Sequence, residues 1–207
     1  MHRGQLKKYA KGDTIYRRGD PGESLMILVA GRLKLAIISL KAKELVLHFA
    51  GVGEAFGEIS ALDGKERALN AIALEASEVF VIYTRDLLPA LTAYPHAMLE
   101  IVRLLCEKLR ARASLLEDRT LEMRARVARG LLRLAQQLGR RRKDGIHLQL
   151  TVSQEELGNY VGLARANVSR QLGQLKHAKA IRIDGARIVI TDERRLAEFA
   201  EAASSRD

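Results

Sequence analysis

The stretch "FGEISALDGKERAL", residues 56–69, combines groups able to hold a small anionic ligand. Glu58 follows Gly57, and Arg67 follows an Asp-Gly turn. A carboxylate accepts hydrogen bonds from sugar hydroxyls, and a guanidinium matches two oxygens of a phosphate. The same residues would also suit a bend in a β-sheet with a surface ion pair. The stretch therefore predicts either a small-molecule site or a structural turn.

A second group of residues, 153–175 ("SQEELGNYVGLARANVSRQLGQL"), has the spacing of two short helices. Ser153 with Glu156 three residues later is a capping box, which predicts the start of a helix. Gly162 predicts its end and a tight turn, and a second helix is expected from about Ala164. Two helices joined by a glycine turn are typical of a helix-turn-helix, and an ordinary pair of packed helices is the alternative.

The outer face of the second helix favours the DNA-binding alternative. No acidic residue occurs between Arg165 and Lys176. Arginine side chains match the O6 and N7 edge of guanine, and recognition helices read bases with their N-terminal residues. The residues expected to read bases are Arg165, Ala166, Ser169 and Arg170.

The residues after this helix, "AIRIDGARIVITD" (180–192), alternate apolar and polar on both sides of an Asp-Gly pair. This pattern is typical of a β-hairpin. It predicts a wing beside the helix-turn-helix, with Arg182 and Arg187 as contacts to DNA phosphates.

The distribution of charge agrees with a nucleic-acid partner. The 207-residue chain has a formal charge of +10. Residues 1–121 carry 18 Lys and Arg against 15 Asp and Glu, whereas residues 122–207 carry 17 against 10. A basic excess in one part of a chain is the electrostatic footprint of a nucleic-acid binder, although a solvated basic surface gives the same count.

The elements that must position these groups follow from the apolar pattern. Residues 11–83 form short apolar runs separated by turn residues, which is typical of an antiparallel sandwich or barrel. An amphipathic helix is expected over residues 126–139, ended by Gly139. The next residues, 140–145 ("RRRKDG"), are expected to form a loop that either contacts phosphate or is solvated.

Between these parts, the apolar spacing changes to four and three, which is typical of a narrow seam on a long helix. No proline or glycine occurs between Pro95 and Gly130. We expect a helix that pairs with its own copy in a two-fold dimer; packing within one chain is the alternative. Arg112 falls on the seam, where its charge needs an anion, a neighbouring glutamate or solvent. The seam residues are Met98, Val102, Leu105, Leu109 and Leu116.

Several function classes have no support in the sequence. The single cysteine, Cys106, excludes a disulfide framework and an iron–sulfur cluster. The five histidines are isolated, so no metal site is expected, and the lone His48 of the strand region does not indicate haem. There is neither a nucleophile elbow nor a P-loop, so an enzyme is not expected. No signal peptide or membrane span is recognisable, and a cytoplasmic protein is expected.

From about Lys11 to Asp192, the chain resembles the CRP/FNR family of bacterial transcription regulators. The resemblance implies an α+β fold with three parts in a fixed order. These are a jelly-roll β-barrel effector domain (1–94), a long dimerisation helix (95–121) and a winged helix-turn-helix (122–207). It also implies a homodimer that binds a pseudo-palindromic site in double-stranded DNA and contacts RNA polymerase. Because the chain begins later than is usual in the family, an opening segment is expected to be missing or the start to differ.

The recognition motif in the catabolite-activator branch is Arg-Glu-x-x-x-Arg, and here it is "RANVSR". Ala166 replaces the glutamate, which accepts a hydrogen bond from the cytosine amino group. We therefore expect a half-site that differs from the activator's at this position, with a thymine methyl as a suitable partner for alanine. Further contacts to DNA phosphates are expected from Ser153, Gln154, Asn167 and Gln174.

Residues 56–69 align with the phosphate-binding cassette of the family, and they are called the cassette below. The resemblance assigns Glu58 to a ribose hydroxyl and Arg67 to a cyclic phosphate. Gly57 and Ile59 belong to the same segment. Ala68 stands where binders have Ser or Thr, and Arg112 and Ala113 stand where binders use a Thr-Ser pair for adenine. Each lost hydrogen bond to a charged phosphate costs roughly 1.5–3 kcal/mol.

Three alternatives follow for the effector: a cyclic nucleotide, a different anionic or apolar molecule, or no ligand with Glu58 paired to Arg67. The rival functions are an effector-independent regulator with a degenerate pocket and a cyclic-nucleotide module that controls a partner protein. In a regulator, effector binding would shift the population of conformers that present both recognition helices to DNA.

Overall fold

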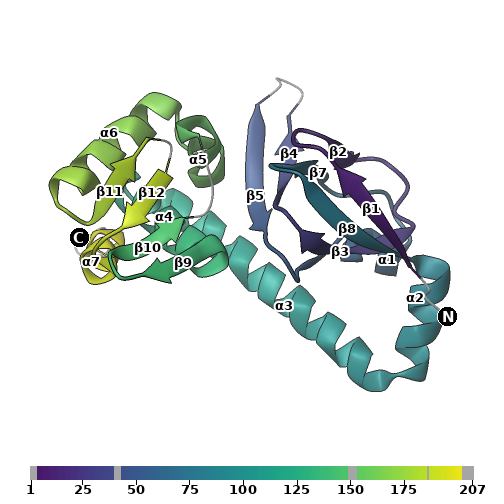
Figure 1. Ribbon diagram of the computed structural model, residues 1–207. Helices are drawn as coiled ribbons and strands as arrows, with labels where there is room; N and C mark the ends of the chain where they lie inside the picture. Colours follow the sequence, from purple (N-terminus) through teal and green to yellow (C-terminus); the bar gives the residue numbers. More distant parts are fainter. Residues whose placement is uncertain (1–3, 40–42, 149–152, 186, 202–207) are drawn as a thin grey trace. The chain divides into compact units, whose positions relative to one another are not determined.

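The computed structural model describes residues 4–39, 43–148, 153–185 and 187–201 (Figure 1). The chain forms two compact units, Met1–Arg112 and Ala113–Asp207. The boundary between them falls inside the long helix α3 (Pro95–Glu117). The residues of the predicted middle part, 95–121, therefore contribute to both units.

The N-terminal unit contains two antiparallel four-stranded sheets, which confirms the jelly-roll-like fold (Figure 1). The first has the order β1 (Gln5–Tyr9), β8 (Ser77–Tyr83), β3 (Ser24–Ala30) and β6 (Ala55–Phe56). The second has the order β2 (Thr14–Tyr16), β7 (Asn70–Ala73), β4 (Leu33–Ile38) and β5 (Glu44–Ala50).

The core of this unit is formed by apolar side chains from both sheets. Along β4, Leu33 and Leu35 are buried, as the alternating pattern predicts. Leu28 and Val79 meet them from β3 and β8 in one buried cluster that also includes Phe56. Strands of both sheets contribute to this cluster, and Phe56, the first residue of the cassette, is part of it. The cassette is therefore attached to the packed core.

Three helices accompany the sheets of this unit. The short helix α1 (Glu58–Asp63) lies within the cassette and is bounded by Gly57 and Gly64, both in the left-handed conformation. Helix α2 (Thr84–Ala93) was not predicted, because its internal Pro89 obscures a helical pattern. Helix α3 then begins at Pro95, a residue well suited to the first turn.

The C-terminal unit begins with the last turn of α3, followed by the 3₁₀ segment η1 (Asp118–Thr120). Its helices are α4 (Met123–Leu138), α5 (Gln154–Val161), α6 (Arg165–His177) and α7 (Glu193–Glu201). Its sheet has the order β11 (Ile181–Asp184), β12 (Arg187–Ile190), β10 (Gly145–Leu148) and β9 (Gly139–Arg142). The β11–β12 hairpin is the predicted wing.

One element of this unit corrects the sequence analysis. Residues 140–145, expected as a loop, form most of strand β9, the turn after it and the first residue of β10. Arg141 lies opposite Ile146 and Arg140 opposite His147. The three arginines of β9 are exposed. Exposed charges are common on edge strands, where they discourage pairing with another chain, but they hide the apolar alternation that reveals a strand.

The helix-turn-helix has the local geometry that its sequence predicts. Ser153 Oγ accepts from the Glu156 amide at 3.1 Å, and the Ser153 amide donates to the Glu156 carboxylate at 2.9 Å. Gly162 ends α5 with φ 72°, in the left-handed region. At Gly158, an added Cβ would lie 2.5 Å from the carbonyl oxygen of Leu163. The close crossing of chain at this turn therefore requires a glycine.

No helix in the described part of the chain is long and apolar enough to cross a membrane. Within the same residues, no group of three or more His, Cys, Asp or Glu side chains is placed to hold a metal ion.

Candidate effector site and DNA-reading surface

Arg67 is buried in the cassette, with 4% of the residue exposed. Its Nη1 donates to the carbonyl oxygens of Ser24 (2.7 Å) and Gly57 (2.8 Å) and to Ser60 Oγ (3.0 Å). Its Nη2 donates to Ser24 Oγ at 2.8 Å. The guanidinium also lies over the Tyr16 ring, 4.5 Å from its centroid. The arginine predicted to bind phosphate is thus hydrogen-bonded to the protein itself.

The glycine before α1 makes this arrangement possible. Gly57 has φ 75°, and a Cβ at this position would lie 2.5 Å from Arg67 Nη1. The close backbone approach predicted for Gly57 is an approach by the arginine side chain. An alanine here would therefore disturb both the backbone and the guanidinium position.

Glu58 is also buried, and its side chain is 3% exposed. Lys108 Nζ from α3 lies 2.8 Å from Glu58 Oε2 and donates to the Ala55 carbonyl oxygen at 2.7 Å. Since Glu58 pairs with Lys108 and Arg67 bonds to Ser24, Gly57 and Ser60, the alternative of a direct Glu58–Arg67 ion pair is wrong for this structure.

Burial dominates the electrostatics of the cassette. It lowers the pKa of Arg67, although the nearby Tyr16, Asp20 and Glu58 oppose this shift. Burial also raises the pKa of Tyr16 far above its ordinary value, against the opposing effect of Arg67. The phenol is therefore neutral and the guanidinium charged at neutral pH.

A small cavity brings most of the predicted effector residues together. It is lined by Gly57, Glu58, Ile59, Arg67, Ala68 and Arg112, among others. Ala113 is exposed and is not among the lining residues. The cavity volume is about 20 Å³, which suits a single water, whereas ligand pockets usually measure about 300–1,000 Å³. The cavity in this structure is therefore too small for a nucleotide.

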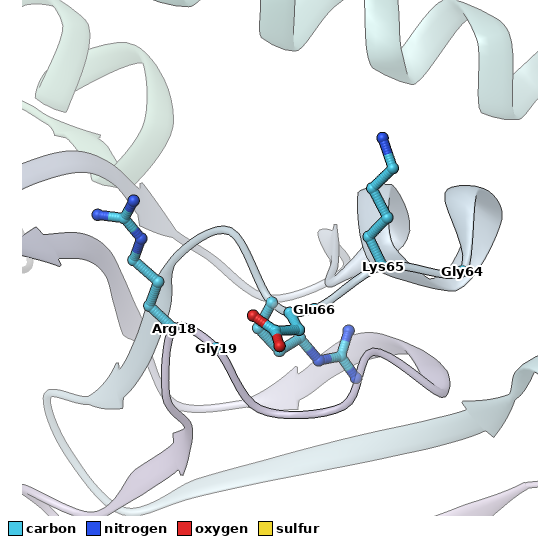
Figure 2. A pocket seen from close by; sticks show the side chains of 6 residues that line it. Arg18, Gly19, Gly64, Lys65 and Glu66 are labelled. Atoms are coloured by element: carbon cyan, nitrogen blue, oxygen red, sulfur yellow. The ribbon is translucent and has the colours of Figure 1, made fainter.

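Arg67 also lines an open groove with a volume of about 700 Å³. Figure 2 shows the side chains of Arg18 and Lys65 extending from separate loops, with Glu66 between them. The Gly19 amide donates to the Arg67 carbonyl at 2.9 Å, and the Arg67 amide donates to the Asp20 carbonyl at 2.8 Å. These two amides are in use, so they do not cradle an anion in the groove.

In the C-terminal unit, α6 exposes the residues predicted to read bases. Arg165, Ala166, Ser169 and Arg170 are exposed and form what is called the reading face below. Val168, Leu172 and Leu175 on the opposite side are buried. Gln174 and Gly173 are also exposed, one turn further along. The helix thus presents two arginines and several small side chains to solvent.

The predicted phosphate contacts are in different situations. Ser153 is exposed, but its hydroxyl caps α5; Gln154 and Asn167 are half-buried. Arg182 Nε donates to Asp184 Oδ2 and its Nη2 to Asp144 Oδ2, both at 2.8 Å. Arg187 is exposed at the start of β12. The guanidinium of Arg182 is thus held by two carboxylates through Nε and Nη2, which partly offset its charge toward a phosphate.

The cyclic nucleotide-binding domain family matches residues 6–94, and the Crp-like helix-turn-helix domain family matches residues 125–199. The CRP-like cAMP-activated global transcriptional regulator of Mycobacterium tuberculosis is 30% identical over 194 residues, covering 93% of this chain and 86% of that protein. The chain belongs to the CRP/FNR family.

Two solved structures have the same fold. A transcriptional regulator of the CRP family from Thermus thermophilus has a TM-score of 0.79 and 30% identity, covering 95% of this chain and 97% of that one. FixK2 from Bradyrhizobium japonicum has a TM-score of 0.85 at 22% identity, covering 95% and 96%. The second likeness concerns the fold alone.

Four residues that contact Glu58 or Arg67 were not predicted from the sequence. Ser60 lies two residues after Glu58 and was within reach of a local search. Lys108 lies one helical turn before Arg112, so it shares a face of α3 with a residue already singled out. Ser24 and Tyr16 are 43 and 51 positions from Arg67, and no local spacing links them to the cassette.

Proposed function

We propose that this protein is a homodimeric, sequence-specific DNA-binding regulator of transcription that acts in the cytoplasm. The observation that carries the proposal is the exposed reading face on the second helix of a capped helix-turn-helix. Arginine forks at positions 165 and 170 suit guanine edges in the major groove. In a two-fold dimer, two such helices would read a pseudo-palindromic site with half-sites about 34 Å apart.

The exposed stripe of α3 supports the homodimer. Val102, Leu109 and Leu116 are 47%, 68% and 67% exposed. A regular apolar stripe on one helix face is expected to be covered by another copy of the same helix. Leu109→Asp should therefore shift the sedimentation equilibrium toward monomer. The matched substitution Val29→Asp, at a residue 44% exposed on β3, should leave the dimer unchanged.

The DNA experiment is a binding-site selection followed by titration of the selected site. Arg170→Ala should weaken binding by about 1–3 kcal/mol and relax the base preference at one position of each half-site. Arg194→Ala removes an arginine from the exposed face of α7, where the side chain is 93% exposed, and should change little. Selection of no sequence by the wild type would refute the proposal and favour a module that controls a partner protein.

For control of DNA binding, the geometry favours a second candidate, a regulator that needs no effector. The hydrogen bonds of Arg67 are made within the protein, Glu58 is paired with Lys108, and the cavity between them measures about 20 Å³. A cyclic nucleotide would have to share or displace these partners, with the buried Arg67 Nε as a donor that has no hydrogen-bond partner among the described residues. The relative in Mycobacterium tuberculosis is cAMP-activated, so effector control remains the alternative.

Titration calorimetry with cyclic AMP and cyclic GMP distinguishes these modes of control. Heat with saturation, together with tighter binding of the selected DNA, would establish a nucleotide effector. Absence of heat up to millimolar nucleotide, with unchanged DNA affinity, would support the effector-independent regulator. Contact with RNA polymerase is part of the proposed function and can be tested by co-sedimentation on the selected DNA.

A further inference from the structure

A buried carboxylate lies where α3 ends in the C-terminal unit. The Asp118 side chain is 3% exposed. Its Oδ2 accepts a hydrogen bond from Arg133 Nη2, and its Oδ1 accepts from Arg129 Nη1 at 3.2 Å. Both arginines are on α4. A charge at this depth is retained only with partners, and here two guanidiniums supply them.

The two arginines also bind α3 itself. Arg133 Nη1 donates to Ser114 Oγ at 3.2 Å, and Arg129 Nη1 lies 3.4 Å from Glu117 Oε1. Ser114 and Glu117 belong to the last turns of α3. Through these two residues and Asp118, α4 holds the end of the long helix and the first residue of the 3₁₀ segment.

The same arginines extend the network to the rest of the unit. The Arg133 guanidinium lies 5.9 Å from the centroid of the Tyr160 ring on α5, the first helix of the helix-turn-helix. Arg129 Nε donates to the Ala200 carbonyl oxygen on α7 at 3.4 Å. The end of α3 is thus joined to the element that carries the reading helix.

A third arginine of α4 donates hydrogen bonds to backbone carbonyl groups in and just after the 3₁₀ segment. Arg126 Nη2 donates to the carbonyl oxygens of Arg119 (2.7 Å) and Leu121 (3.0 Å). These bonds satisfy backbone acceptors at the chain reversal between α3 and α4. The compact C-terminal unit accordingly begins at Ala113, inside α3, and not at the start of α4.

We propose that Asp118 is a positioning residue that fixes the direction in which α3 leaves the DNA-binding unit. In a dimer joined through α3, this direction sets the separation of the two reading faces. The protein would then select DNA by the spacing between half-sites as well as by their bases. The inference rests on the proposed homodimeric DNA-binding function.

The physical reason is that buried ion pairs add little net stability but favour one arrangement of their partners. With a rigid connection, the second half-site is bound only if its spacing matches. With a loose connection, the effective concentration of the second DNA-binding unit at the second half-site is lower. It also depends less on the spacing between the half-sites. The anchor therefore affects how affinity varies with spacing, which a residue that only stabilises the fold would not change.

The test uses the full-length protein and Asp118→Asn, which keeps the shape and removes the charge. Its affinity is measured for the selected palindrome, for the same palindrome with one or two base pairs added or removed at the centre, and for a single half-site. We expect the ratio between the correct and altered spacings to fall about fivefold or more, the low end of coupling between linked sites. Half-site affinity should stay as in the wild type.

The matched control is Glu193→Gln, which neutralises one acid of an exposed pair in the same unit, 2.9 Å from Arg141 Nη2. It should keep the wild-type spacing ratio. Because Asp118→Asn removes the buried acid that the half-buried Arg129 and Arg133 share, Ser114→Ala serves as a milder variant. It removes only the Arg133 hydrogen bond to α3 and should lower the ratio in the same direction.

A spacing ratio unchanged in folded Asp118→Asn would overturn the inference, as would an unchanged ratio in Ser114→Ala if the first variant does not fold. Failure of the proposed function has a different signature. In that case the wild type itself would select no site or would be a monomer.

Discussion

Lys108 of α3 and Glu58 of the cassette form an ion pair, with 2.8 Å between Nζ and Oε2. The pair is largely buried, since the two side chains are 17% and 3% exposed. It connects the first turn of α1 to the long helix within the N-terminal unit. A ligand that binds the Glu58 carboxylate would share it with Lys108, so occupancy of the cassette would change a contact of α3.

The first prediction concerns this pair. Lys108→Met leaves a buried carboxylate without its partner and should lower the free energy of unfolding by about 3–5 kcal/mol. Denaturation by guanidinium chloride, followed by far-ultraviolet circular dichroism, measures the change. The double variant Lys108→Met/Glu58→Gln should recover part of the loss, because no charge is then left unpaired.

The control for this prediction is the exposed pair of Lys8 and Glu78, 3.0 Å apart, with side chains 77% and 34% exposed. Lys8→Met should change stability by less than about 1 kcal/mol, as surface ion pairs do. Equal effects of Lys108→Met and Lys8→Met would show that the Glu58–Lys108 pair is solvated in solution.

The second prediction concerns Arg67, whose four hydrogen bonds need a planar fork with several donors. Lysine keeps the charge but cannot reproduce this geometry. Arg67→Lys should therefore destabilise the ligand-free protein by about 2 kcal/mol or more. Arg18→Lys, at an exposed position beside the open groove, should stay within about 0.5 kcal/mol of the wild type. An Arg67→Lys protein as stable as the wild type would mean that this arginine is held for a ligand and not for the fold.

The DNA-binding unit could be predicted closely because its signals are local. Ser153 with Glu156, and Gly162 six residues on, form a capping box and a left-handed helix end that lie within ten residues of each other. The prediction of a loop at β9 was wrong, because the three consecutive arginines of this strand show no alternation of apolar and polar residues. Arg182 was expected to face phosphate, and its partner Asp144 lies 38 positions away, where no spacing rule reaches.

The sequence located the cassette but did not predict which side chains pair with its two charged residues. Glu58 and Arg67 are nine positions apart and recognisable together, whereas their partners Lys108 and Ser24 come from distant elements. A buried cation or carboxylate needs some partner, so burial alone predicts that partners exist. Which side chains supply them depends on how α3 and β3 pack around the cassette, and this is a property of the tertiary structure.

The third prediction is that two glycines of the helix-turn-helix respond to alanine with opposite signs. At Gly158, a Cβ would lie 2.5 Å from the backbone oxygen of Leu163, so Gly158→Ala should destabilise by about 1–3 kcal/mol. At Gly173, a Cβ would meet no atom within 4 Å, so Gly173→Ala should stabilise by about 0.5–1 kcal/mol through helix propensity. Thermal unfolding of both variants checks the signs, and two changes of the same sign would contradict the packing of α5 on the turn.

The fourth prediction concerns acid. Burial raises the pKa of Glu54, but the hydrogen bond and charge of His48, 2.5 Å away, the Gly51 amide and Lys108 outweigh it, so the pKa is lowered. A depressed pKa means that the unfolded state binds the proton more readily. The stabilisation is therefore present above the unfolded pKa of about 4.3 and is lost as the pH falls through the folded value.

Glu54→Gln removes this dependence. The difference in unfolding free energy between the wild type and the variant should be larger at pH 7 than at pH 3, as measured by urea denaturation across that range. The effect should be modest, because the Glu54 side chain is 34% exposed and partly screened. A difference that is constant with pH would exclude the charged pair as its cause.

The last prediction returns to the reading face, where Ala166 lies one turn before Arg170 on the exposed side of α6. A glutamate at this position can accept a hydrogen bond from a cytosine amino group, which alanine cannot. Ala166→Glu should therefore gain a preference for cytosine at one position of each half-site, worth about 1–3 kcal/mol against the other bases. Binding-site selection with the wild type and the variant in parallel measures the change.

Gln174→Glu, which adds the same charge further along α6, should instead lower the affinity for all sequences alike, because it repels phosphate without reaching a base edge. If both variants bound all DNA sequences more weakly by the same factor, residue 166 would not contact a base. The bases would then be read by Arg165 and Arg170.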